Sequence, residues 1–460
     1  MSKPESPPAK GDAIQRNWTE GSIARNLWSL SWPMLINNTL NALGPTVDMI
    51  WVGTLGASAI AGVGVSGLAV MVVNSLISGL FTGTIALVAR HIGARDEQGA
   101  NLAAQQAFII GLVFSALMAL IGIFLAAPFL RALGVDASVV DEGATYLRIQ
   151  LIGIVTMTVL QAAQSIMQAS GDAVQPMIIS VGYRLLQVVL CPALIFGWGF
   201  FPRLEVSGAA LSNVITQGLG GIFALYILFT GRTRITVTLK NFRFDGKIVW
   251  RTVSIGIPAA FSFMQRNIAE LVLMWFITPF GTLAVAAQSV SQRVDQFLQN
   301  LSGGLGSAAG VLAGQNLGAG RPERAERTGW LAVLLATVVS LICALVIWLW
   351  IVPILRIFTH DADVLSMAAT FLRIMIISYL VWGLVVSLSL VLNGVGDTLV
   401  QMLTNLATMV FVQLTLAYFL SRYTSLGVYG IRWAVVIGVV MRAVIYTAYF
   451  KTGRWKRKRF

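Results

Sequence analysis

The chain has 460 residues, of which 57% are hydrophobic and only 11% are charged, and its mean hydropathy is +0.78. This composition excludes a water-soluble globular protein and indicates one that lies mostly within a lipid bilayer. The formal net charge of +13 leaves nucleic-acid binding open until the basic residues are placed along the chain.

The amino-terminal segment 1–25 is polar and contains several prolines, so we expect a disordered start without a signal peptide. Twelve apolar runs follow, each of a length suited to a helix that crosses a membrane. In chain order they span residues 27–52, 58–90, 101–128, 140–168, 174–198, 206–230, 252–278, 282–314, 327–355, 364–394, 400–421 and 427–450. The sequence therefore predicts an all-α polytopic membrane protein with twelve transmembrane helices.

The Lys and Arg residues gather on one side of the predicted membrane. Counting helices places twenty-one of them at the amino terminus, in the 2–3, 6–7 and 8–9 connections and in the tail. The opposite side receives Arg131, Arg203, Arg356 and Arg422. By the positive-inside rule both termini are cytoplasmic. Because these charges are loop anchors at lipid headgroups rather than one basic groove, we expect no nucleic-acid partner.

The second half of the chain repeats the first at a constant offset, without gaps. The matches include Pro33 with Pro258, Gly56 with Gly281, Pro128 with Pro353, Arg148 with Arg373, and Gly171-Asp172 with Gly396-Asp397. Such a repeat indicates a duplication of six helices. Since six is even, the two copies are related by a pseudo-two-fold axis along the membrane normal, as in alternating-access transporters.

The duplication divides the chain into five regions. We predict a disordered cytoplasmic start over residues 1–25, an N-lobe over 26–231, a cytoplasmic linker over 232–251, a C-lobe over 252–450 and a basic cytoplasmic tail over 451–460.

Several segments resemble multidrug and toxic compound extrusion (MATE) transporters. They are residues 33–56, which contain Val47-Asp48-Met49-Ile50-Trp51, the turns at 92–95 and 315–323, and the repeated Gly-Asp pairs. The resemblance covers the whole chain and is closer to the DinF-type branch than to the NorM branch. It implies a twelve-helix exporter in the bacterial inner membrane that exchanges H⁺ or Na⁺ for small amphipathic, often cationic, organic compounds. We expect a monomer surrounded by lipid.

An acidic side chain lies inside the first predicted helix. Asp48 follows Asn37 and Asn41 at helical spacing, which places three polar groups on one face, turned toward the lobe interior. A charged group within the bilayer is a functional hypothesis by default. Burial favours the neutral acid, so Asp48 could take up and release a proton, or it could be a hydrogen-bonded structural residue. A permanent positive partner for Asp48 would argue against proton coupling.

The resemblance assigns Asp48 the role of the coupling acid of the first lobe. Its partners differ from the family pattern, since Gln187 and Cys191 stand before Pro192 where many relatives have Asn and Asp, and Asn213 stands where Thr is common. A Na⁺ site needs several oxygen ligands, and Cys191 removes one. We therefore predict H⁺ coupling through Asp48, Gln187 and Asn213, with Na⁺ as the alternative.

The second lobe carries two acids and two bases within predicted spans, namely Arg266, Glu270, Arg293 and Asp295. They could cancel one another in a neutral structural network, or form a substrate or proton site in the cleft. In the NorM-type branch a Glu stands at the position of Arg266, so the mechanism of that branch does not transfer intact.

Methionines recur near these polar positions. Met34, Met49, Met264 and Met274 could line an adaptable apolar pocket for substrate, and core packing explains them equally well.

Two functions other than export fit the sequence less well. A lipid-linked saccharide flippase of the same superfamily would need cleft arginines, which Arg148, Arg266, Arg293 and Arg373 could supply. An enzyme is not expected, because His91 and His360 fall on opposite faces and no metal-ligand spacing or nucleophile motif occurs. We accordingly expect no metal, no cofactor and, from the isolated Cys191 and Cys343, no structural disulfide.

Overall fold

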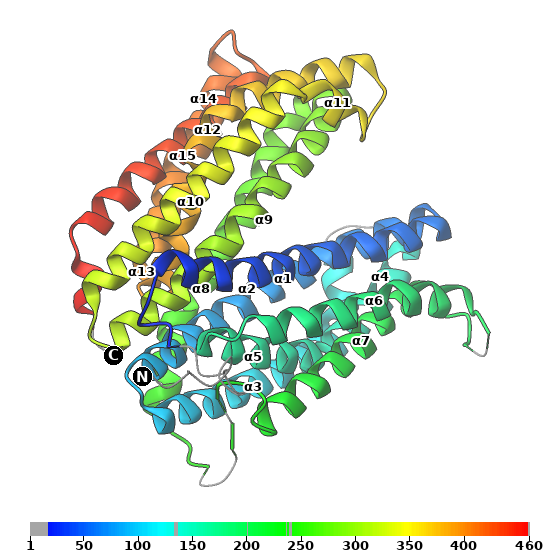
Figure 1. Ribbon diagram of the computed structural model, residues 1–460. Coiled ribbons are helices and arrows are strands. Elements are labelled where there is room, and N and C mark those ends of the chain that lie inside the picture. Colours follow the sequence, from blue (N-terminus) through cyan, green and yellow to red (C-terminus); the bar gives the residue numbers. More distant parts are fainter. Residues whose placement is uncertain (1–16, 133–136, 200, 236, 239–241, 459–460) are drawn as a thin grey trace, which may run out of the picture.

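The computed structural model describes residues 17–132, 137–199, 201–235, 237–238 and 242–458. All regular elements among these residues are helical, and the two halves of the chain form two lobes (Figure 1). The N-lobe comprises α1 (Ile23–Val52), η1 (Gly53–Leu55), α2 (Ala57–Gly93), α3 (Glu97–Ala132), α4 (Ala137–Ile152), α5 (Ile154–Ser170), α6 (Val174–Phe196) and α7 (Glu205–Phe229).

The C-lobe repeats this order of helices. It comprises α8 (Gly246–Ile277), η2 (Thr278–Phe280), α9 (Thr282–Gly318), α10 (Pro322–Leu349), α11 (Ile351–Arg356), α12 (Ala362–Gly394), α13 (Thr398–Asn405), η3 (Leu406–Leu414), α14 (Thr415–Tyr423) and α15 (Val428–Lys451), followed by η4 (Arg454–Arg457). The offset that carries Pro33 onto Pro258 also carries both ends of α2 onto both ends of α9.

The turns repeat as well. Gly171 ends α5 in the left-handed region, at φ 92°, and its counterpart Gly396 has φ 78°. Glycine adopts this conformation without the steric penalty of a Cβ, so the repeated Gly-Asp pairs mark equivalent helix ends. Asp245 begins α8 as an N-cap, with its carboxylate accepting from the backbone N–H of Lys247 at 2.8 Å.

Within the described residues, eight helices are long and apolar enough to cross a membrane, and α4 with α5 would form a ninth span bent by 45°. The remaining spans are α1, α8 and α9, which carry the acids Asp48, Glu270 and Asp295. The total of twelve agrees with the sequence. The bend was not predicted: residues 140–168 were expected to form one helix, but the chain breaks at Gly153.

Two further spans are less regular than the sequence indicated. The predicted helix 327–355 is interrupted at Trp350, between α10 and α11. The predicted helix 400–421 contains η3, a nine-residue π-helix, between α13 and α14. The wider turn of a π-helix changes which side chains share a face, and such segments occur frequently at functional sites.

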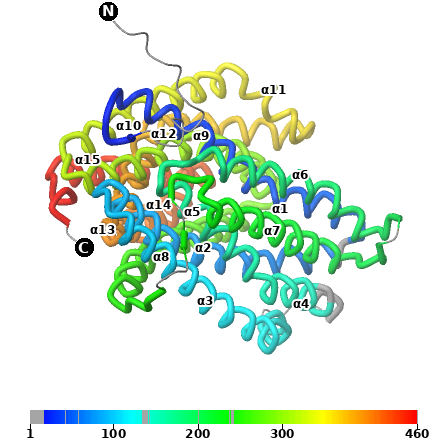
Figure 2. The backbone as a smooth tube through the Cα atoms, turned by 60° about the horizontal axis from the view of Figure 1, so that its bottom comes forward, coloured from blue at the N-terminus to red at the C-terminus, as the bar shows by residue number. Residues whose placement is uncertain are grey.

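The lobes lie together at the end of the molecule where the described chain begins and ends, and diverge toward the other end (Figure 1). Figure 2 shows the backbone with the lower end of that view turned forward. At the joined end one buried cluster includes Leu30 and Met34 of α1 together with Leu305 and Leu312 of α9. The lobes are therefore closed by apolar packing on the side of the termini.

Glycines bring the two lobes into backbone contact at this end. A Cβ on Gly93 would overlap the backbone oxygen of Gln315, and a Cβ on Gly318 would overlap that of Arg90. Gly93 and Gly318 are repeat counterparts, and so are Arg90 and Gln315. The two contacts are thus one contact repeated between the lobes, which supports the predicted pseudo-two-fold relation of the two halves.

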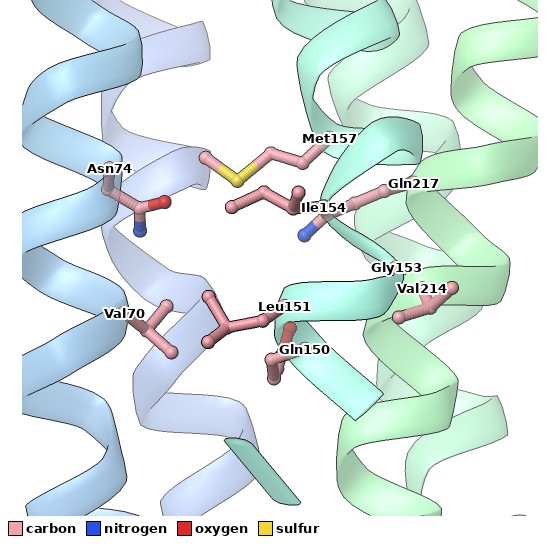
Figure 3. A pocket seen from close by; sticks show the side chains of 9 residues that line it. All are labelled: Val70, Asn74, Gln150, Leu151, Gly153, Ile154, Met157, Val214 and Gln217. Atoms are coloured by element: carbon pink, nitrogen blue, oxygen red, sulfur yellow. The ribbon is translucent and has the colours of Figure 1, made fainter. Parts of the chain in front are cut away.

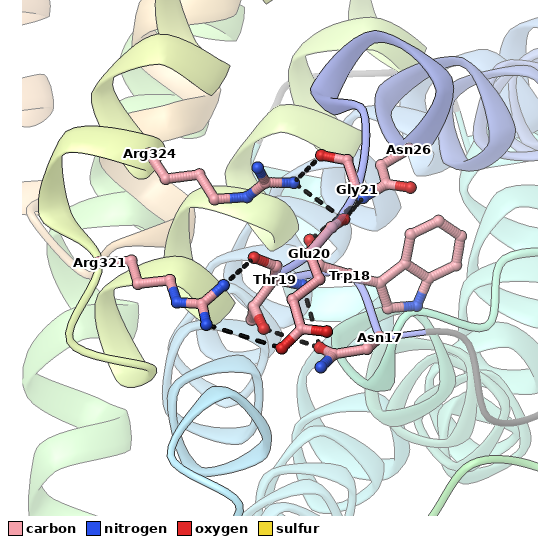
Figure 4. A network of polar contacts seen from close by, with 8 residues as sticks. All are labelled: Asn17, Trp18, Thr19, Glu20, Gly21, Asn26, Arg321 and Arg324. Carbon is pink, nitrogen blue, oxygen red and sulfur yellow. Dashed lines mark hydrogen bonds and ion pairs between the residues drawn. The ribbon is translucent and has the colours of Figure 1, made fainter.

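The amino-terminal segment also crosses between the lobes. The predicted disordered start covers residues 1–16, which lie outside the described residues, and 17–25, which are ordered. Arg321 donates to the backbone oxygen of Thr19 at 2.6 Å, and Arg324 donates to that of Gly21 at 2.8 Å (Figure 4). Trp18 is buried, at 7% exposure. The prediction is therefore wrong for the part that is described.

The carboxyl-terminal segment is folded back rather than free to lie on lipid. Trp455 is fully buried and stacks on Phe450, with ring centroids 4.7 Å apart. Lys458 pairs with Asp397, and Lys456 with Glu326 at 2.5 Å. The predicted basic tail thus forms part of the C-lobe as far as Lys458.

Candidate functional site

The acid predicted from the first helix lies in a polar cluster between three helices of the N-lobe. Asp48 of α1 is 4% exposed. Its Oδ1 accepts from Gln187 Nε2 of α6 at 2.8 Å, and its Oδ2 accepts from Asn213 Nδ2 of α7 at 2.5 Å. The thiol of Cys191 approaches Oδ1 at 3.8 Å. The structure thus brings together the three residues predicted as the ion-coupling group, although their role stays a prediction.

A basic residue that was not predicted lies beside them. Arg184 of α6 is 7% exposed and donates through Nη1 to Gln187 Oε1. Gly44 of α1 leaves the space for this guanidinium, because a Cβ there would overlap it. Among the described residues no ion pair joins Arg184 directly to Asp48, and Gln187 links the two. Arg184 therefore places a permanent positive charge near Asp48 without forming an ion pair with it.

The predicted polar face of α1 belongs to the same network. Tyr183 donates its hydroxyl to Asn41 Oδ1 at 2.5 Å, and Ser180 donates to Asn37 Oδ1. Gln164 of α5 donates to Ser180 Oγ at 3.0 Å. Asn37, which is buried, and Asn41, which is exposed, thus both bond to α6 within the N-lobe, as expected, and they hold α1 against α6.

The four charges placed within C-lobe spans do not all pair with one another. Asp295 of α9, 8% exposed, accepts from Arg432 Nη1 of α15 at 3.1 Å and from the hydroxyl of Tyr379. Arg293 is exposed and does not pair with Asp295. Arg293 and Asp295 do not cancel one another, because residues two apart on a helix point about 200° apart.

The pair on α8 is more exposed than that of Asp295 and Arg432. Arg266 and Glu270 lie on successive turns of α8, with Nε and Oε1 3.5 Å apart. Gln292 donates to Glu270 Oε2 at 3.1 Å, and Arg266 also donates to Gln299. These contacts join α8 to α9.

The methionines do not form one pocket. Met34 is 2% exposed and packs in the core between the lobes, which agrees with core packing, the second of the two interpretations of the sequence. Met49 is exposed, and Met264 and Met274 are half-buried. None of the four lines either of the C-lobe cavities described next.

Two adjoining cavities lie in the C-lobe. The larger has a volume of about 240 Å³ and reaches α1 at Asn38, and the smaller has a volume of about 100 Å³. Both are lined by Arg266, Gln299, Trp382 and Arg442. The smaller one also reaches Glu270, Asp295 and Arg432.

Three arginines of these two lobes were not predicted from the sequence. They are Arg184, Arg432 and Arg442, all buried and all within predicted spans. The test that identified Asp48, a charged residue inside an apolar run, would find each of them when applied to every base within a predicted span.

The buried pair of Asp295 and Arg432 gives a stability prediction. Arg432→Met leaves an acid buried without its cation, which typically costs about 3–5 kcal/mol, so we expect a lower melting temperature in detergent. Asp295→Leu combined with Arg432→Met removes both charges and should recover most of the loss. Circular dichroism or a thermal-shift assay measures both.

The exposed pair of Arg203 and Glu205 supplies the control. These groups are 3.2 Å apart with side chains 65% and 59% exposed, so Arg203→Met should change the melting temperature little. Equal losses for the single and the double C-lobe variants would contradict the interpretation of a compensated buried pair.

Comparison with known proteins places this arrangement in a family context. The MatE family model matches residues 33–193 and 258–419, one stretch in each lobe. The two matches begin at Pro33 and Pro258, which are counterparts in the internal repeat.

The relatives are full-length matches at low identity. A probable multidrug resistance protein, YoeA of Bacillus subtilis, is 23% identical over 97% of each chain. A probable multidrug resistance protein named NorM, of Thermotoga maritima, is 24% identical over 95% of this chain and 94% of its own. An FAD transporter of Shewanella oneidensis is 25% identical over 86% of this chain and 87% of its own. Because these names differ, the DinF-type assignment stays a prediction.

Solved structures share the whole fold. A MATE protein crystallised with the compound MaL6 matches with a TM-score of 0.90 and 25% identity, over 97% of this chain and 98% of that one. A MATE family multidrug transporter in an outward-facing conformation matches with a TM-score of 0.89 and 25% identity, over the same shares. The predicted twelve-helix, two-lobed fold is confirmed.

Proposed function

Because this chain belongs to the MATE family of membrane transporters, we propose that it is a secondary active exporter. It moves small amphipathic organic compounds out of the cell in exchange for H⁺, as a monomer in a bacterial inner membrane with both termini cytoplasmic. The observation that carries the proposal is a buried carboxyl group, Asp48, held by uncharged amides near a fixed guanidinium.

Protonation of Asp48 changes the charge of this cluster. When Asp48 is ionised, its charge balances that of Arg184, and the cluster is neutral overall. When Asp48 is protonated, Arg184 remains positive and uncompensated. A positive group on the cargo is therefore accepted beside the ionised acid and repelled after protonation, which couples proton entry to cargo release.

The neighbouring amides accommodate both states. Asn213 donates Nδ2 to the carboxylate at 2.5 Å, and rotation of its amide would present Oδ1 to accept from the protonated acid. Na⁺ fits this cluster less well. A metal ion requires several free oxygen ligands, but Gln187 Oε1 is engaged by Arg184, and the guanidinium would repel a second cation.

The closed end of the molecule indicates the direction of opening. With the termini on the cytoplasmic side, the lobes are packed there and diverge on the outside, so the structure corresponds to an outward-facing state (Figure 1). Alternating access would then require the contacts around Gly93 and Gly318 to separate.

A reconstituted transport assay tests the function. Proteoliposomes that contain the purified protein and a cationic fluorescent dye are given a pH gradient or a Na⁺ gradient of the same size. We expect dye movement with the pH gradient and none with Na⁺ alone. Movement of lipid-linked saccharides but not of dye would establish the flippase alternative, for which Arg148, Arg293 and Arg373 would have to converge. All three are exposed and line neither C-lobe cavity.

A further inference from the structure

The C-lobe cavities contain buried positive groups whose donors are not all used. Arg442 of α15 is 7% exposed and donates through Nε to Thr408 Oγ1 at 3.0 Å. Its Nη2 is buried without a hydrogen-bond partner. Arg432 likewise leaves Nε and Nη2 without partners, and Trp382 leaves Nε1. All three side chains line the smaller cavity, so its walls present unsatisfied donors.

The charges around this cavity do not balance. Arg266, Arg432 and Arg442 contribute three positive charges, and Glu270 and Asp295 contribute two negative ones. Asp295 pairs with Arg432, and Glu270 lies beside Arg266. Arg442 has no acidic partner among the described residues. A buried cation without a counter-charge is strongly unfavourable inside a membrane, and such a residue is usually retained for a function.

The duplication shows that packing alone does not require these charges. The N-lobe has a hollow of about 10 Å³ at the equivalent place, lined by residues that include Val70, Gln217 and Met157 (Figure 3). At the repeat offset, Val70 corresponds to Asp295, Gln217 to Arg442 and Met157 to Trp382. One lobe thus closes this space with uncharged side chains, whereas the other has a larger space and a positive charge.

The backbone beside Arg442 differs between the lobes as well. Thr408, which accepts from Arg442, lies in the π-helix η3. The equivalent segment of the N-lobe, residues 181–189, is ordinary α-helix within α6. The irregular turn therefore occurs in the lobe that has the arginine, and it places a hydroxyl against the guanidinium.

We propose that the C-lobe cavity binds an anionic group of the exported compound, a carboxylate, sulfonate or phosphate, with Arg442 as its principal ligand. The inference rests on the proposed export of organic compounds and narrows their class. The preferred cargo is a zwitterion or an organic anion, and a simple cation lacks the group that the C-lobe recognises. Arg432 and Trp382 supply further donors to the same group.

A pair of dyes that differ in one group tests this directly. Tetramethylrhodamine with a free carboxylate is a zwitterion at neutral pH, and its methyl ester is a cation of nearly the same shape. Fluorescence anisotropy with the purified full-length protein in detergent measures the affinity for each. We expect the free acid to bind about tenfold more tightly or better, as charge-assisted hydrogen bonds imply.

The variant Arg442→Gln introduces the residue that the N-lobe has at the equivalent position. We expect it to weaken binding of the free acid about tenfold and to leave binding of the ester unchanged, which a general structural defect would not do. Arg442→Lys keeps the charge and should retain part of the preference. Arg356→Gln, at an exposed arginine of the same lobe that lines neither cavity, should bind both dyes as the unmodified protein does.

Several results would overturn the inference. One is an equal affinity of the unmodified protein for the free acid and for the ester. This comparison uses no variant, so it does not depend on whether a variant folds. Another is an equal loss of both affinities in Arg442→Gln. Displacement of the acid by phosphatidylglycerol but not by benzoate would assign the cavity to a lipid headgroup. The dye affinities are measured without a proton gradient. They can therefore support or contradict the anion site whether or not the protein exports compounds in exchange for protons.

Discussion

Asp48→Asn should abolish export driven by a pH gradient. Asparagine has nearly the size of the acid but cannot release or take up a proton. It mimics the protonated state, in which the charge of Arg184 is uncompensated, so the variant should also bind a cationic dye more weakly at every pH. The measurement is dye efflux from proteoliposomes with the inside at different pH values, compared with the unmodified protein.

The variant should still fold. Asp48 accepts one hydrogen bond from Gln187 Nε2 and one from Asn213 Nδ2. Asparagine has one amide oxygen and one NH₂ group in place of the two oxygens, so it keeps both bonds only if a neighbouring amide rotates. The loss of about one hydrogen bond is expected, or roughly 0.5–1.5 kcal/mol. We therefore expect a small decrease in melting temperature beside a complete loss of coupled transport, and this difference separates a coupling role from a structural one.

A matched control is available on the same lobe. Asp141 of α4 is exposed, so Asp141→Asn removes one acid without touching the cluster and should leave efflux unchanged. Undiminished proton-driven efflux by Asp48→Asn would refute the coupling role. An unfolded Asp48→Asn protein would instead support the structural interpretation of this acid.

The architecture could be predicted from the sequence because the patterns that indicate it extend over many residues. Twelve apolar runs and a repeat at a constant offset each extend over most of the chain, and the structure repeats element bounds at that offset, as α2 and α9 show. Local irregularities were not predicted. The break at Gly153 and the π-helix from Leu406 depend on how neighbouring helices pack, and neither leaves a distinct pattern of hydrophobicity.

The acid of the candidate site could be predicted, but only part of its surroundings. Asp48 is conspicuous because a charge in an apolar helix is rare. Gln187 and Asn213 entered through the family resemblance, since contacts across 139 and 165 residues cannot be read from spacing. The partner of Asp295 could not be predicted for the same reason. Arg432 is 137 residues away, while Arg293 is near in sequence but turned away.

Gly318→Ala should shift the protein toward a state in which the lobes part on the side of the termini. An added Cβ would overlap the backbone oxygen of Arg90, which a side-chain rotation cannot relieve. Overpacking of this kind typically costs about 1–3 kcal/mol, which corresponds to a change of about 5- to 150-fold in the ratio of the two states. Transport should slow, because each cycle must return to the closed contact.

Spin labels across the contact measure this shift. Glu97 at the start of α3 and Glu323 in the first turn of α10 are exposed and lie on opposite lobes. Double electron–electron resonance between labelled cysteines at these two positions, with Cys343→Ser to prevent labelling there, gives the distribution of distances. Gly318→Ala should increase the population at long distance, and Gly93→Ala should do the same, since the axis makes the two contacts equivalent.

The effects of Gly318→Ala and Gly93→Ala can be compared with each other and with a control glycine variant, because the pseudo-two-fold axis relates the first two. Gly64→Ala adds the same methyl group to α2 at a position where nothing lies within 4 Å, so it should leave both distances and transport unchanged. If Gly318→Ala and Gly93→Ala behave like Gly64→Ala, the closed end is not a moving contact, and rocking of two rigid lobes is excluded. If only one of them shifts the distances, the lobes do not move about the axis that the duplication defines, and the cycle must involve bending within one lobe.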